Sequence, residues 1–195
     1  MPGVNFKVGK GAKVGLIGEA GCGKTTTMKS IMRTLPQNAS VPNGEILFKG
    51  KDILKADKKD LQQIRRKAIS MVFQDPTAAL NPVFKIKDQL FDIIKYANIK
   101  EEGSSPSRDE ITAEAIRVLK EVALPDPERI LENYPFQLSG GMRQRVCIAM
   151  ALVAANDLLI ADEPGTSLDV TIEDQILRLI GRLVVEKNLS VILIS

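Results

Sequence analysis

Histidine is absent from this sequence of 195 residues, and tryptophan is absent as well. For the residues given, the lack of histidine excludes a histidine-ligated zinc site, a Ser-His-Asp catalytic triad and a histidine general base. Cysteine is also scarce, since Cys22 and Cys147 are too few for an all-cysteine metal site or a disulfide scaffold. This cysteine usage fits a reducing cytosol.

Long apolar segments are missing too. The longest uninterrupted apolar run, 146–155, has ten residues, whereas a membrane-spanning helix needs about 18 to 20. The N-terminus shows no apolar segment ahead of a small-residue cleavage site, so no export signal is indicated. A net charge of +3 is too small to indicate nucleic acid or an anionic membrane surface as a partner. We therefore expect a cytoplasmic protein, which leaves room for docking onto a membrane partner.

The residues that are present have the composition of a globular domain, with 44% apolar and 26% charged residues. Strand-like and helix-like segments alternate, which predicts an α/β fold with a mostly parallel central sheet and flanking helices. The expected strands cover 13–17, 45–48, 69–73, 158–161 and 190–195. The expected helices beside them cover 24–35, 60–67 and a segment whose buried face comprises Ile172, Ile176, Leu179, Ile180, Leu183 and Val184.

Between residues 76 and 155 the apolar residues recur almost throughout with helical periodicity. Two buried helical faces are predicted, one with Ile86, Leu90, Ile93, Ile94 and Ala97, the other with Ile111, Ala115, Leu119 and Val122. Ser107 followed by Glu110 is a capping box, which predicts the start of the second helix. The polar stretch 100–106 is expected to be a mobile connection.

The segment GEAGCGKT at 18–25 fits the pattern G-x-x-x-x-G-K-[ST] and lies between a predicted strand and a predicted helix. In this pattern, glycines let backbone N–H groups surround phosphate oxygens, and the helix N-terminus adds a favourable dipole. We expect Lys24 to reach the β- and γ-phosphates of a nucleotide and the Thr25 hydroxyl to bind Mg2+. The expected nucleotide-binding residues are Gly18, Glu19, Ala20, Gly21, Cys22, Gly23, Lys24, Thr25 and Thr26.

Cys22 lies inside this loop, at a helix N-terminus that favours its thiolate form. One interpretation is a redox-sensitive site. The other, which we favour, is a small side chain that points away from the nucleotide.

Two carboxylates follow the strand expected at 158–161, in the sequence LLIADEP. We expect Asp162 to hold Mg2+, through a water molecule. Because side chains alternate along a strand, Glu163 is expected to point the other way and to polarise the attacking water. Coupled with the phosphate loop in the same chain, this acidic pair predicts nucleotide hydrolysis.

The sequence LSGGMRQR at 138–145 resembles the signature of the ATP-binding-cassette (ABC) family. Gln74 matches the Q-loop of that family, and 167–169, with Asp169, matches its D-loop. The resemblance covers essentially the whole chain and implies a P-loop NTPase fold of ABC type. It also implies one nucleotide-binding domain, with an ATP-binding core at 1–75 and 156–195 and an inserted helical subdomain at 76–155.

The sequence at 73–82 and at 134–137 further resembles that of the ATPases of oligopeptide and dipeptide (and nickel) importers. That resemblance implies a peripheral subunit on the cytoplasmic face of the membrane, with ATP and Mg2+ as cofactors. The implied partners are a second ATPase subunit, two membrane permeases and, indirectly, an extracytoplasmic binding protein. No nucleic acid is expected.

In this family two such domains enclose two ATP molecules head to tail, and closing and opening of the pair moves the permease. The resemblance implies that Lys24 of one copy and the signature of the other contact the same γ-phosphate. The implied signature contacts are Ser139, Gly140, Gly141 and Met142. The implied catalytic residues are Glu163, Gln74 and Lys24, and the implied Mg2+ ligands are Thr25, Gln74 and Asp162.

The chain departs from the family pattern at several points. Gly165 stands where the importer group has threonine, which predicts a loss of stiffness before the D-loop. The aromatic residue that stacks on adenine and the switch histidine that follows the last strand are both missing. We therefore expect that both ends of a longer protein lie outside this sequence, that the absent histidine reflects this, and that the chain alone hydrolyses ATP poorly.

Two alternatives remain open at this stage. One is a soluble ABC ATPase that acts on nucleic acid or ribosomes, although 75–137 carries no coiled coil or zinc module of the kind such relatives insert. The other is a nucleotide-binding module with little turnover, against which the intact Lys24, Asp162 and Glu163 argue.

Overall fold

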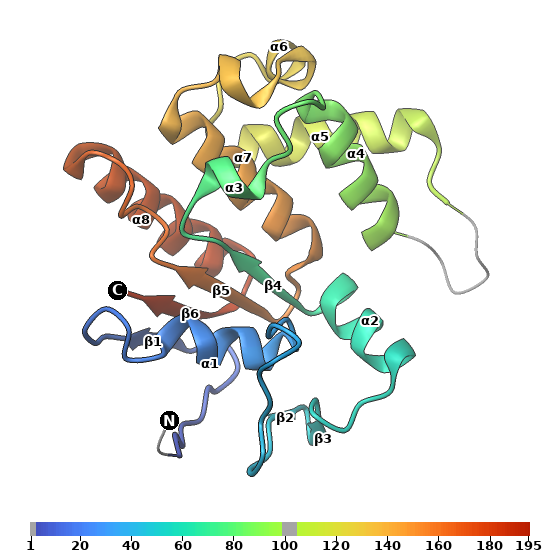
Figure 1. Ribbon diagram of the computed structural model, residues 1–195. Helices are drawn as coiled ribbons and strands as arrows, with labels where there is room; N and C mark the ends of the chain where they lie inside the picture. The colour runs from blue at the N-terminus through green and yellow to red at the C-terminus, as the bar shows by residue number, and fades with distance from the viewer. Residues whose placement is uncertain (1–2, 99–104) are drawn as a thin grey trace.

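Four parallel strands, drawn from distant parts of the chain, form the central sheet of the computed structural model (Figure 1). In chain order they are β1 Lys13–Leu16, β4 Ile69–Val72, β5 Leu158–Asp162 and β6 Ser190–Ile194. Their spatial order is β1–β6–β5–β4, and Leu158 of β5 lies opposite both Ile69 and Ser190. The structure describes residues 3–98 and 105–195, and no helix within these ranges is long and apolar enough to cross a bilayer.

Helices cover both faces of this sheet. Their bounds are α1 Lys24–Ile31, α2 Lys58–Lys67, α7 Gly140–Ala154 and α8 Val170–Glu186. Ile160 of β5 packs in a cluster with α1 and α2, whereas Leu159 and Ala161 pack in a cluster with α7 and α8. Neighbouring residues of a strand point to opposite faces, so β4, β5 and β6 are buried on both sides, as is usual for parallel strands.

The chain between β4 and β5 is helical. Its elements are α3 Pro76–Ala79, α4 Ile86–Ala97, α5 Arg108–Glu121, α6 Pro127–Glu132, the 3-10 helix Pro135–Gln137 and α7. These helices share one apolar cluster that continues down to the sheet, and Figure 1 shows α3 to α6 gathered at the end of the molecule away from the N-terminus. The predicted buried faces are confirmed, except that Ile93 and, on α8, Ile172 are only partly buried.

The predicted capping box starts α5, as expected. The Ser107 Oγ accepts a hydrogen bond from the Glu110 N–H at 3.3 Å, and a Glu110 carboxylate oxygen accepts one from the Ser107 N–H at 2.7 Å. The connection expected at 100–106 lies mostly outside the described residues.

The strand expected to be buried at 13–17 is different in the structure. β1 ends at Leu16 and forms an edge of the sheet as the structure describes it, with β6 as its hydrogen-bonded neighbour. Lys13 and Gly15 are exposed, and Val14 and Leu16 are only half-buried. The prediction of a buried strand was wrong because an apolar run does not reveal whether a strand has one neighbour or two.

The first helix is shorter than predicted. α1 ends at Ile31, four residues before the expected end at Leu35, and Arg33 has a left-handed backbone with φ of +49°. Arg65 of α2 donates hydrogen bonds to the carbonyl oxygens of Met32 and Arg33. A side chain 32 residues away therefore satisfies the carbonyl groups at this helix end.

A hairpin takes the place of the single strand expected at 45–48. It consists of β2 Leu47–Phe48 and β3 Lys51–Asp52, which pair antiparallel. The two turn residues between them, Lys49 and Gly50, have φ of +50° and +81°. Positive φ at both central positions is what a two-residue hairpin turn requires.

Candidate functional site

The predicted site residues meet at the carboxyl ends of the parallel strands. The loop 17–23 follows β1, Gln74 follows β4, and Asp162 and Glu163 lie at the end of β5. The backbone N–H of Glu163 donates to the carbonyl oxygen of Ile194 at 3.1 Å and so ties the end of β5 to that of β6. Ligand sites of open α/β sheets form at this edge.

The glycine-rich loop turns sharply into α1. Gly21 and Gly23 have φ of +81° and +100°, a conformation that a residue with a side chain rarely adopts. A Cβ atom at Gly18 would lie 2.9 Å from the Cys22 Sγ, so this position is closed to any side chain as the loop stands. Cys22 itself is exposed, and both interpretations of its side chain stay predictions.

Lys24 is the first residue of α1 and only 9% exposed. Its ammonium donates hydrogen bonds to the carbonyl oxygens of Gly18 and, at 3.1 Å, Glu19, so it lies across its own loop. One Glu163 carboxylate oxygen is 4.0 Å from the same nitrogen. The cation is thus fixed over the loop, with backbone N–H groups and a helix N-terminus beside it.

Thr25 and Asp162 form the second part of the site. The Thr25 hydroxyl donates to a carboxylate oxygen of Asp162 at 3.0 Å, and Asp162 is only 3% exposed. Burial raises the pKa of Asp162 above its ordinary value, the Thr25 hydrogen bond lowers it, and the charge of Glu163 raises it again. A hydroxyl and a buried carboxylate are the hard oxygen donors that suit Mg2+, which proteins hold through one or two carboxylates and the substrate's phosphates. The residues present therefore fit this ion.

Replacing Asp162 with asparagine tests the cost of this buried charge. The folded-state pKa of Asp162 lies above the unfolded value of 3.8, so the fold disfavours the charged form. The free energy of unfolding of the native chain therefore falls as the pH rises through this folded-state pKa. In the absence of metal and nucleotide, Asp162→Asn is expected to be more stable than the native chain at pH 7, and this advantage should shrink toward pH 4. Urea unfolding between these pH values measures it.

The control for that experiment is Asp92→Asn, which removes an exposed carboxylate on α4. An Asp162→Asn chain that is less stable than the native chain at pH 7 would show that the Thr25 contact outweighs the burial cost.

Gln74 and Glu163 form the third part of the site. The Gln74 amide donates to a carboxylate oxygen of Glu163 at 2.8 Å. β5 ends at Asp162, and Glu163 has a left-handed backbone with φ of +44°. The expected alternation of Asp162 and Glu163 along a pleat is wrong, because Glu163 is outside the strand. A strained backbone at this position, held by the Ile194 contact, is typical of functional sites.

The signature and the D-loop lie side by side within the chain. Ser139 caps α7 by accepting a hydrogen bond from the Met142 N–H at 3.3 Å, and Asp169 caps α8 through the Ile172 N–H at 3.0 Å. A Cβ atom at Gly140 would lie 3.0 Å from Leu168, and one at Gly141 would lie 2.9 Å from Ile172. The two signature glycines therefore permit close packing of α7 on the D-loop, a contact that the sequence motifs do not reveal.

No hydrogen bond or ion pair in the described ranges joins Ser139 or Met142 to the loop 18–25. Within the described part of one chain, the signature and the phosphate loop are therefore not joined by polar contacts of these two kinds.

Gly165 packs closely against Glu173 of α8. A Cβ atom there would lie 3.1 Å from the Cα and 2.6 Å from the Cγ of Glu173. The turn before the D-loop thus packs directly on α8, and a threonine would not fit without movement. The expected loss of stiffness stays a prediction.

The family described as "ABC transporter" matches residues 1–166. A probable peptide ABC transporter ATP-binding protein of Sinorhizobium fredii is 46% identical over 92% of this chain and 52% of its own length. A dipeptide transport ATP-binding protein of Bacillus subtilis is 46% identical over 99% of this chain and 56% of its own length. The chain spans about half the length of these curated relatives.

Solved structures share the fold. The ATP-binding cassette MJ0796, described as a dimer in a post-hydrolysis state bound to ADP and Pi, superposes with a TM-score of 0.82 at 27% identity. The match covers 98% of this chain and 78% of that one. CbiO1 of Clostridium perfringens, described as part of the ABC transporter complex cbiONQ, has a TM-score of 0.79 at 27% identity, over 99% of this chain and 70% of its own.

Proposed function

The chain belongs to the ABC transporter family, and from this premise we propose that it binds ATP with Mg2+ and hydrolyses the ATP to power a transporter. The observation that carries the proposal is the convergence of Lys24, Thr25, Gln74, Asp162 and Glu163 at one edge of the sheet, joined by short polar contacts. These five side chains come from three separate segments, one after β1, one after β4 and one at the end of β5, so their meeting is a property of the fold.

Each residue has a role in the proposal. Residues 18–26 surround the phosphates, with Lys24 at the β- and γ-phosphates. Thr25, Asp162 and Gln74 hold Mg2+, which when bound offsets phosphate charge. Glu163 orients and polarises the attacking water, and Gln74, at 2.8 Å from it, holds its carboxylate in place.

A second ATPase subunit, identical or different, completes the site. Its Ser139, Gly140, Gly141 and Met142 would contact the γ-phosphate from the opposite side, with the N–H groups at the start of α7 as donors. Two observations support this arrangement. Among the residues that the structure describes, no hydrogen bond or ion pair joins Ser139 or Met142 to the phosphate loop of the same chain, and MJ0796 is described as dimeric. Gly140 packs against Leu168, so the next residue, Asp169, lies close to this contact.

The proposed cargo is peptides or similar small solutes, imported through two permease subunits that an extracytoplasmic binding protein supplies. Two relatives, which are named as ATP-binding proteins of peptide and dipeptide transport, support this part. In the proposal the chain is peripheral on the cytoplasmic face of the membrane. Its ATP-binding core comprises 1–75 and 156–195, and 76–155 is the inserted helical subdomain. The segment after Gln74 contacts the permeases.

The contact between the segment after Gln74 and the permeases has a direct test. Val83 is 70% exposed, in the segment between Gln74 and α4. An affinity-tagged chain in its native cells should retain two permeases, and Val83→Asp should reduce their recovery while leaving ATP binding unchanged, because a charge in an apolar contact is costly. Mass spectrometry of the purified complex measures the recovery.

The matched control is Val185→Asp on α8, which is 64% exposed and far from Gln74 in the sequence. Equal loss from both variants would refute the contact surface, and recovery of ribosomes or DNA in place of permeases would refute transport.

A further inference from the structure

A second concave region lies at the opposite end of the sheet from the ATP site. It has a volume of about 530 Å3 and is lined by residues that precede the strands, Lys67 before β4, Asn156 before β5 and Leu189 before β6. β5 is five residues long, which separates its first and last residues by about 13 Å. This cavity is therefore distinct from the cluster around Asp162.

Most of the charged residues that line this cavity, among those that the structure describes, are positive. Four lining residues are cationic and one, Glu114, is anionic. The cations are Arg66, Lys67, Arg117 and Lys187. A volume of this size lies within the range of small-molecule sites.

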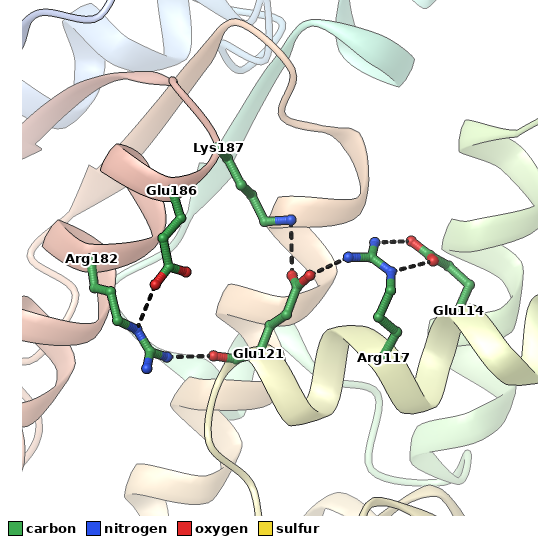
Figure 2. A network of polar contacts seen from close by, with 6 residues as sticks. All are labelled: Glu114, Arg117, Glu121, Arg182, Glu186 and Lys187. Atoms are coloured by element: carbon green, nitrogen blue, oxygen red, sulfur yellow. Dashed lines mark hydrogen bonds and ion pairs between the residues drawn. The ribbon is translucent and has the colours of Figure 1, made fainter.

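Two of the four cations already have carboxylate partners, as Figure 2 shows. Arg117 of α5 binds both oxygens of Glu114 and also pairs with Glu121, and Lys187 pairs with Glu121 at 2.9 Å. Arg182 of α8 adds a hydrogen bond to the Glu121 carbonyl oxygen at 2.7 Å. These contacts join α5 to the end of α8 along one wall of the cavity.

The other two cations have no such partner. Within the described residues, neither the Arg66 guanidinium nor the Lys67 ammonium takes part in an ion pair, and the Arg66 Nε is buried without a hydrogen-bond acceptor. Both residues lie in the last turn of α2, where a positive charge faces the helix dipole favourably. The dipole favours these charges but provides no counter-charge, so both cationic groups that line the cavity are unpaired within the described residues.

We propose that this cavity binds a small phosphate-bearing anion, with Arg66 and Lys67 as its principal ligands. The planar fork of an arginine matches the oxygens of a phosphate, and the adjacent ammonium adds a second charge-assisted contact. The bound anion would also compete with Glu114 and Glu121 for Arg117 and Lys187. Binding would therefore loosen the link between α5 and α8, which makes the cavity a regulatory site at a distance from ATP.

The test uses the chain with Lys24→Ala, so that binding at the phosphate loop does not mask the cavity. Pyrophosphate is titrated into the 15N-labelled protein, and the amide signals of Asn156 and Leu189 report on the cavity. Adding Arg66→Gln or Lys67→Gln is expected to weaken the binding at least about tenfold, the effect of losing one charge-assisted contact. Lys58→Gln, at the exposed start of the same helix, removes the same charge and should leave the binding unchanged.

A parallel titration with AMP distinguishes the source of the phosphate. Shifts with both probes support the proposal for any small phosphate compound, and shifts with AMP alone support it for nucleotides. Signals of Asn156 and Leu189 that stay unmoved by both probes would overturn it, as would equal weakening by Lys58→Gln and Lys67→Gln. Because Lys67 is exposed, its variant remains decisive even if Arg66→Gln fails to fold.

Discussion

Replacing Lys24 with alanine is expected to weaken ATP binding by at least about 100-fold, because two charge-assisted contacts to phosphate oxygens are lost together. The structure holds this lysine in place. The Lys24 ammonium is buried, and its contacts to the carbonyl oxygens of Gly18 and Glu19 fix it over the loop. Calorimetric titration of the 195-residue chain with ATP in the presence of Mg2+ measures the effect.

The control for this variant is Lys58→Ala, which removes an exposed lysine at the start of α2. Circular dichroism establishes whether both variants keep the fold. An affinity for ATP within threefold of the native chain, in a folded Lys24→Ala protein, would contradict the assignment of the loop 18–25 as the phosphate site.

Replacing Glu163 with glutamine is expected to separate binding from hydrolysis. The amide keeps the size of the side chain and can still accept a hydrogen bond from Gln74, so ATP affinity should remain. The loss of the carboxylate should lower turnover about 100- to 10,000-fold, the usual contribution of a general base. With ATP present and not consumed, the two-subunit form should accumulate, which light scattering with ATP and with ADP detects.

The comparison variant is Glu128→Gln, an exposed carboxylate on α6 that lies outside the site. Both turnover rates are compared with the native 195-residue chain under the same conditions. A Glu163→Gln chain with native turnover would refute the proposed role of this residue, and a chain that stays monomeric with ATP would refute the sandwich of two subunits.

Much of this arrangement can be predicted from the sequence because the signals are local. The phosphate loop, the acidic pair and the cap at Ser107 each depend on residues within a few positions of one another, and the structure contains them where the sequence indicates. Helical periodicity likewise identifies the buried faces of α4 and α5, since a helix that packs on one side must repeat its apolar residues. The structure brings Gln74 within hydrogen-bond distance of Glu163, a contact that the sequence motifs do not state, and the roles of both residues remain proposals.

What the sequence does not predict depends on distant contacts. The end of α1 is set by Arg65, and the need for glycine at position 165 by the backbone of Glu173. β3 contains only Lys51 and Asp52, so it has no apolar alternation to mark it. The cationic cavity has no motif, because Arg66 and Lys187 meet only through the fold.

The pairing of β1 with β6 has a consequence for how the chain folds during synthesis. Lys13 lies opposite Val191, so β1 leaves the ribosome long before its sheet neighbour is made. The contacts among α4, α5 and α6 span far shorter stretches and can form early, since loops of low sequence separation close at less entropic cost. The sheet edge beside the phosphate loop therefore gains its partner later than these helices gain theirs. We expect a nascent chain of this protein to pass through a stage in which α4, α5 and α6 are packed while β1, and the nucleotide site that follows it, still await β6.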